Sequence, residues 1–209
     1  MPAKIAIIYY TTYGHIRKLV DATAAGVKAA KGADGAPLNA EVTIYQFPEI
    51  LSDEILAKQY AAPKDTSIPV IKATDLPQYD GFIFAFPTRY GRAVAQASAF
   101  FDSTGGLWAS QALNGKMGSI VTSTATQHGG QETTVATTLP FFAHHGIIFV
   151  PIGYKSKLIS TTDAVQGGSP WGATTVAGPD GSRQPSELEL ELAAYHGEHF
   201  ASIVTKYVS

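Results

Sequence analysis

Short apolar runs recur along the chain, and they are rich in β-branched and aromatic residues. Most are nearly continuous instead of alternating with polar positions, which is typical of strands covered on both faces in a parallel sheet. The pattern predicts five strands: Lys4–Tyr10, Glu41–Gln46, Gly81–Phe86, Lys116–Thr122 and Gly146–Pro151.

Helical periodicity fills most of the intervals between these strands. The segment His15–Ala30 places Ile16, Leu19, Val20, Thr23 and Val27 on one face, and helices are also predicted over Ala93–Ser103 and Gln131–His144. Strands that alternate with helices predict an α/β fold, with a doubly wound five-stranded parallel sheet and helices on both of its faces.

The C-terminal stretch "SELELELAAYHGEHFASIVTKYV" first alternates like a strand. Its apolar and aromatic positions nevertheless recur at helical spacing over five turns, and Ser186 with Glu189 has the form of a capping box. We therefore predict a helix here.

Two long segments fit neither period, and they read as irregular insertions in a single domain spanning residues 1–209. They are Pro48–Pro77 and Tyr154–Pro185. Long loops in a compact domain are usually functional or interfacial. The second segment carries Leu158, Ile159, Val165 and Trp171 with little regular structure to bury them, so we expect it to lie at an interface between subunits.

Composition excludes several classes of protein. The net charge is −2, which gives no electrostatic basis for binding nucleic acid or anionic membranes. There is no cysteine, the six histidines lack the spacing of a metal site, and no metal is predicted. The apolar runs are too short to span a bilayer, and no secretion signal is apparent, so we expect a cytoplasmic protein.

Three polar turns follow the first, third and fourth predicted strands: Thr11–Ile16, Pro87–Arg92 and Ser123–Gly130. In a doubly wound sheet, ligands bind at this carboxyl edge of the strands. The first turn opens a helix, whose free N–H groups favour an anion. It has neither the lysine of a nucleoside triphosphate loop nor a G-x-G-x-x-G motif, so it suits one phosphate monoester; a capped helix start is the alternative.

The second and third turns favour a flat ring next to that phosphate. The stretch Thr88–Gly91 offers an aromatic face, backbone donors and a cation, and Ser123–Gly130 is long and polar. The paired aspartates of a receiver domain are missing from the first turn. Fold and turns together indicate a protein of flavodoxin type that binds flavin mononucleotide (FMN).

Six stretches together resemble the WrbA family of NAD(P)H:quinone oxidoreductases: "YYTTYGHI", "FPTRYGR", "STGGLWASQALNGK", "GGQETT", "AHHGIIFVPIGY" and "GGSPWGATTVAGPDGSRQPSELEL". The resemblance covers about Lys4 to Lys206, and the divergent middle, Leu51–Thr74, is similar to fungal benzoquinone reductases. It implies a flavodoxin-like fold, reversibly bound FMN, NADH or NADPH as co-substrate, a quinone substrate, and a homotetramer, a dimer of dimers, with sites at subunit contacts.

The resemblance also implies roles for single residues. The FMN phosphate is expected on Thr11, Thr12, Tyr13, Gly14, His15 and Ile16, the ring and ribityl chain on Pro87, Thr88, Arg89, Tyr90 and Gly91, and the other side on Ser123, Thr124, Ala125, Thr126, Gln127 and His128. Tyr13 resembles the position that meets the nicotinamide nucleotide, Trp108 the substrate-facing aromatic residue, and His144 the catalytic polar wall that also borders the flavin. Here "STATQHGGQE" departs from the glycine-rich family loop.

Each of these residues has an alternative role. Trp108 could anchor a loop in the core, His144 could cap a helix, and Arg89 could be a surface ion-pair partner.

The function implied by the resemblance is two-electron reduction of quinones by NAD(P)H through ping-pong hydride transfer, which would protect against semiquinones and oxidative stress. The alternatives are a flavodoxin-like electron carrier, which the net charge of −2 fits poorly, and a non-catalytic flavin-binding regulator.

Overall fold

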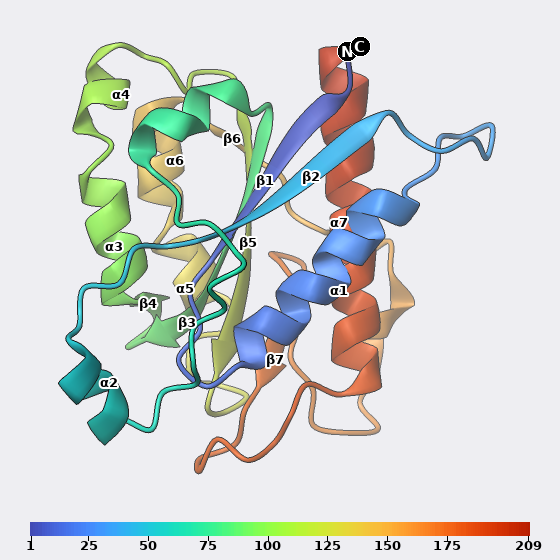
Figure 1. Cartoon of the computed structure of the whole chain (residues 1–209). Coiled ribbons are helices and arrows are strands. Elements are labelled where there is room, and N and C mark those ends of the chain that lie inside the picture. Colours follow the sequence, from blue (N-terminus) through green and yellow to red (C-terminus); the bar gives the residue numbers. More distant parts are fainter.

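The computed structural model describes all residues, 1–209. A central sheet separates two layers of helices (Figure 1). Its strands are β1 (Ala3–Tyr9), β2 (Ala40–Gln46), β3 (Gly81–Arg89), β4 (Arg92–Ala93), β5 (Met117–Thr124), β6 (Ile148–Phe149) and β7 (Thr174–Val176). The parallel strands follow the order β2-β1-β3-β5-β6, β4 forms a hairpin with β3, and β7 pairs with β5. This is the doubly wound α/β fold that the apolar runs predicted.

The helices are α1 (His15–Ala29), α2 (Asp53–Lys58), α3 (Ala95–Asp102), α4 (Gly105–Ala109), α5 (Thr133–Ala136), α6 (Leu139–His145) and α7 (Glu187–Val208), with 3₁₀ turns η1 (Ala73–Gln78) and η2 (Lys157–Ser160). Helices α1 and α7 cover one face of the sheet, and α3 to α6 cover the other (Figure 1). Gly26 and Gly197 lie where α1 and α7 cross, and a Cβ at either would clash with the opposing backbone. The two helices therefore pack with their backbones in contact.

The fifth strand differs from its prediction over Gly146–Pro151. Only Ile148 and Phe149 pair with the start of β5, at Met117 and Gly118. The chain then leaves the sheet and returns as β7, which pairs with the end of β5 over Thr122–Thr124. The last position in the sheet is therefore shared by two short strands separated by an insertion.

Two predicted helices also have different bounds. The segment Gln131–His144 contains two short helices, α5 and α6, because Pro140 lacks the N–H that a continuous helix would use and lies instead in the first turn of α6. Helix α3 begins at Ala95 because Arg92 and Ala93 pair with β3. The C-terminal helix is confirmed, and Ser186 and Glu189 form its capping box.

The two long segments are more ordered than their composition predicted. The first contains α2 and η1, and it buries Ile71 and Leu76 in the core. The second contains η2 and β7, and its Leu158 and Trp171 pack against the core of their own chain. The expectation that this segment lacks an internal surface was therefore wrong for these side chains, whereas Val165 is about half exposed (49%).

Candidate FMN site

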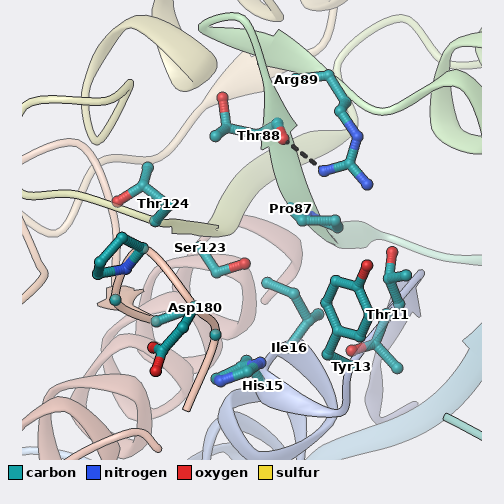
Figure 2. Close-up of a pocket in the computed structure, with 16 residues that line it drawn as sticks. Thr11, Tyr13, His15, Ile16, Pro87, Thr88, Arg89, Ser123, Thr124 and Asp180 are labelled. Carbon is teal, nitrogen blue, oxygen red and sulfur yellow. Dashed lines mark hydrogen bonds between the residues drawn. The ribbon is translucent and has the colours of Figure 1, made fainter. Parts of the chain in front are cut away.

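A cavity of about 390 Å³ opens at the carboxyl ends of the central strands. The turn after β1, the carboxyl ends of β3 and β5, and the loop after β7 contribute its walls, and Figure 2 shows their side chains converging. The lining consists of Thr11, Thr12, Tyr13, His15, Ile16, Pro87, Thr88, Arg89, Ser123, Thr124, Ala125 and Ala177 to Gly181. All three turns singled out in the sequence thus meet at one place.

The turn between β1 and α1 forms a cradle of free backbone donors. The N–H groups of Thr12, Tyr13, His15 and Ile16 have no backbone acceptor. Gly14 makes this possible because it caps α1 with a left-handed φ of 90°, which a residue with a side chain adopts only under strain. Donors that converge at the start of a helix fit a phosphate group.

The threonines of this turn have different roles. Thr11 Oγ1 accepts the N–H of Gly14 at 3.0 Å, so it shapes the turn. Thr12 is buried, and its Oγ1 has no hydrogen-bond partner. A buried hydroxyl without a hydrogen-bond partner destabilises the fold unless a ligand supplies an acceptor. Together with the free N–H groups, this hydroxyl makes a set of donors that fits a phosphate monoester. Tyr13 is about half exposed (54%) at the cavity mouth.

His15 is buried at the first turn of α1. Its Nε2 lies 3.0 Å from the carbonyl oxygen of Arg183, which comes from a distant part of the chain. A carbonyl only accepts, so Nε2 carries the proton and donates. The ring therefore has a fixed orientation, and Nδ1 has no protein partner.

The second wall is the end of β3, Pro87 to Arg89, which continues into a tight hairpin with β4. Gly91 in this hairpin does not line the cavity. Tyr90 and Gly91 occupy the turn of the hairpin with φ of 56° and 75°, the two positive values that a two-residue turn of this kind requires. The Tyr90 side chain is fully exposed and does not line the cavity. Arg89 does line it, belongs to no salt bridge, and donates from Nη1 to the carbonyl of Thr88 at 2.9 Å (Figure 2). The Arg89 guanidinium is thus available to a ligand.

The third wall follows β5. Ser123 and Thr124 are buried and line the cavity together with exposed Ala125. Thr124 Oγ1 donates to the carbonyl of Thr126 at 2.6 Å and accepts from Gln131 Nε2 at 2.6 Å, which folds the loop back on itself. Thr126, Gln127 and His128 are exposed and lie outside the cavity lining, so a flavin contact for them stays a prediction.

A fourth wall was not anticipated. Residues 177–183, which we name the strap, follow β7, and Ala177 to Gly181 face the other three loops. Ala177 N–H donates to the carbonyl of Thr124 at 2.8 Å, which joins the strap to the end of β5. The short apolar run "ATTV" before it was the available sequence signal, but three strand residues inside a long Gly- and Pro-rich segment do not reveal their pairing partner.

A buried carboxylate lies behind the strap. Glu189 is fully buried, and its oxygens accept from Arg183, Ser186, Gly167 and Thr175 among others. Burial alone would raise the pKa of Glu189, but the Arg183 guanidinium and these donors together hold the pKa below its usual value. Glu189 is therefore ionised and paired.

Trp108 and His144 lie away from this cavity. Trp108 is on α4 and His144 is in the last turn of α6, and both helices lie at the other end of the sheet from the start of α1 (Figure 1). Trp108 is half exposed (51%), and His144 is exposed. It is the neighbouring His145 that is buried, with Nε2 2.9 Å from Thr104 Oγ1. Within one chain, neither Trp108 nor His144 reaches the site.

None of the helices combines the length and apolar character that a membrane-spanning segment requires.

Residues 3–156 match the family described as NADPH-dependent FMN reductase. Quinone-oxidoreductase QR2 of Triphysaria versicolor is 50% identical over 207 residues, covering 99% of this chain and 97% of the relative. The P25 protein of Schizosaccharomyces pombe is 49% identical, covering 96% of each chain, and the minor allergen Alt a 7 of Alternaria alternata is 45% identical, covering 99% of this chain and 98% of the allergen.

Solved structures agree on the fold. A flavodoxin-like, WrbA-like protein from Agrobacterium tumefaciens superposes with a TM-score of 0.66 at 19% identity, covering 98% of this chain and 99% of that one. Flavodoxin 2 from Bacillus cereus superposes with a TM-score of 0.56 at 18% identity, covering 99% and 100%. With the family match and the close relatives, these likenesses confirm the relationship that the sequence motifs predicted. The chain belongs to the NADPH-dependent FMN reductases, a family of flavoprotein oxidoreductases.

Proposed function

We propose that this protein reduces quinones by two electrons at the expense of NADH or NADPH, with FMN in the cavity at the carboxyl ends of β1, β3, β5 and β7. The observation that carries the proposal is the cradle at Thr11–Ile16, in which free N–H groups and the unpartnered hydroxyl of buried Thr12 face one cavity. The relative named as a quinone oxidoreductase, identical at half of the aligned positions, supports the choice of substrate.

FMN, when bound, supplies hydride chemistry that amino-acid side chains lack. The chain's own residues bind and orient the reactants. The cradle would hold the phosphate, and Pro87 to Arg89 and Ser123 to Ala125 would enclose the rest of the cofactor. The Arg89 guanidinium lines the same cavity, where it can stabilise negative charge. Tyr13 at the mouth offers an aromatic face to the nicotinamide nucleotide.

The overall reaction consumes NAD(P)H, a proton and a quinone, and it yields NAD(P)⁺ and a hydroquinone. We propose that nucleotide and quinone use the same mouth in succession, which is ping-pong kinetics. Because the quinone receives its electrons as a pair, no quinone radical is released, and this supports a protective role under oxidative stress.

Trp108 and His144 enter this proposal through a second copy of the chain. They lie on adjacent helices, α4 and α6, far from their own cavity. Trp108 is half exposed and His144 is exposed, so both side chains are accessible to another subunit. We propose a homotetramer with two-fold symmetry, in which Trp108 and His144 of one subunit border the flavin of another. A cytoplasmic location stays a prediction.

The proposed activity is tested by flavin analysis and turnover together. We expect purified protein reconstituted with excess FMN to retain FMN and not FAD, measured by chromatography of the released flavin. We also expect oxidation of NADH or NADPH that depends on added benzoquinone, with parallel lines in double-reciprocal plots. Protein that binds FMN but shows no quinone-dependent turnover would instead be an electron carrier or a regulator.

A further inference from the structure

The strap lacks regular structure, yet it forms a whole wall of the cavity. It contains Gly178 and Gly181, both with positive φ. Within the strap, Arg183 N–H donates to the carbonyl of Ala177 at 2.9 Å, and Asp180 Oδ1 accepts from the Ser182 N–H and hydroxyl. These local bonds shape the strap but do not fix its distance from the cradle. Just beyond the strap, Lys18 Nζ of α1 donates to Gln184 Oε1 at 2.8 Å, but this bond joins two exposed side chains. A buried attachment lies behind the strap.

Glu189 supplies that attachment. Its carboxylate is 0% exposed. The oxygens accept from Arg183 Nη1 at 2.9 and 3.0 Å, and also from four groups of the surrounding chain, which are Gly167 N–H at 2.7 Å, Thr175 Oγ1 at 2.8 Å, Val176 N–H at 3.2 Å and Ser186 N–H at 2.8 Å. One carboxylate therefore joins the segment before β7, β7 itself, the strap and the start of α7.

Arg183 carries this attachment to the cradle. Its guanidinium donates to the carbonyls of Val176 and Val165 at 2.6 and 2.8 Å, in addition to Glu189. Its own carbonyl oxygen lies 3.0 Å from His15 Nε2. A continuous chain of bonds thus runs from Glu189 through Arg183 to the ring of His15. Figure 2 shows His15 beside Asp180 of the strap, at the same end of the cavity.

We propose that Glu189 is a positioning residue for FMN: through Arg183 it holds the strap and the His15 ring in the arrangement that receives the phosphate end of the cofactor. The inference rests on the proposed location of the phosphate at Thr11–Ile16. It goes beyond that proposal because Glu189 and Arg183 do not line the cavity and act through the residues that do. This chain of hydrogen bonds ends beside the proposed phosphate position. Disrupting it should therefore weaken the binding of FMN more than the binding of riboflavin, which has the same ring without the phosphate.

The test is a fluorescence titration of flavin-free protein with FMN and with riboflavin. Glu189→Gln keeps the size of the side chain but removes the charge that pairs with Arg183. We expect it to weaken FMN binding about tenfold, the lower end of the loss seen when a residue that orients a metal ligand is removed, and to change riboflavin binding little. Glu191→Gln is the matched control, because Glu191 is exposed on the same helix and makes no side-chain bond; it should leave both affinities unchanged.

A second variant covers the case in which Glu189→Gln does not fold by circular dichroism. Arg183→Lys keeps the positive charge but cannot reach Val165, Val176 and Glu189 together, so it should also weaken FMN selectively. Unchanged FMN affinity in a folded variant, or equal losses for FMN and riboflavin, would overturn the positioning role. Wild-type protein that does not prefer FMN to riboflavin would instead overturn the proposed phosphate site.

Discussion

His196 makes the acid sensitivity of this fold predictable. Its ring is fully buried in the middle of α7. Nδ1 accepts from Ala173 N–H at 3.2 Å, and Nε2 lies 2.6 Å from Ser119 Oγ, which donates to the carbonyl of Val150 at 2.8 Å. The ring is therefore the neutral tautomer with its proton on Nε2. A second proton, on Nδ1, would point at the N–H group of Ala173 and would have no hydrogen-bond acceptor.

The magnitude follows from the pKa. Burial, with a smaller contribution from His199, lowers the pKa of His196 from 6.5 to about 3. Between pH 6.5 and pH 3, His196 binds a proton in the unfolded chain but stays neutral in the folded chain. Its contribution to the free energy of unfolding is therefore fully present above pH 6.5 and is lost as the pH falls toward 3. The loss from this group is about 2 kcal/mol between pH 7 and pH 5.

Urea unfolding at pH 7 and pH 5 measures this loss. His196→Gln removes the titrating group while its amide can still accept from Ala173 and donate to Ser119. We expect the free energy of unfolding to fall between the two pH values by about 2 kcal/mol more in the wild type than in His196→Gln. His128→Gln, at an exposed histidine, should behave like the wild type. An equal fall in wild type and His196→Gln would refute the reasoning.

Four further outcomes are expected. Thr12→Glu places a carboxylate in the phosphate cradle and should weaken FMN binding at least about tenfold by charge repulsion, whereas Thr12→Val should cost far less; flavin retained after gel filtration measures both. Gly14→Ala should destabilise the fold by about 1 kcal/mol, or ~2–4 °C in thermal unfolding, because φ is 90° there and no atom lies within 4 Å of the added methyl group. Trp108→Ala and His144→Ala should each lower quinone turnover with flavin content unchanged. Normal rates in both variants would contradict the shared site and favour the alternative roles, a loop anchor for Trp108 and a helix cap for His144. Sedimentation should show a tetramer that FMN stabilises, and a monomer with full activity at every concentration would contradict the shared site.

Local patterns predicted the parts of the fold that local forces specify. The strands β1, β2, β3 and β5 were placed to within about three residues at each end, because continuous apolar runs between turns leave little choice of register. Helix α7 was assigned correctly against a misleading alternation, since its cap and its five-turn periodicity agreed. Strand β7 has three residues, and it exists only because the end of β5 offers an unpaired edge. No local pattern encodes that.

The candidate site shows the same contrast between features that the local sequence specifies and features that depend on long-range pairing. The turns after β1, β3 and β5 could be found because each follows a recognisable strand, and part of each lines the cavity. The strap could not be found, because its position depends on the pairing of β7 and on Glu189, which the sequence offers only as the cap of a helix. The capping box predicted for Ser186 and Glu189 was right, yet it hid the second role of the same carboxylate.

The interrupted fifth strand explains how this second role arises. Had β6 continued along the whole of β5, the chain would have passed directly to α7, and the end of the sheet next to Thr124 would have no strap. The insertion lets β7 pair with Thr122–Thr124 and delivers the strap to the carboxyl edge, where the Arg183 carbonyl meets His15 across 168 positions of sequence. Arg183 is held by Glu189 at the start of α7, and α7 packs directly on α1. The phosphate end of the site is therefore completed by the last element of the chain, although its cradle is encoded in the first.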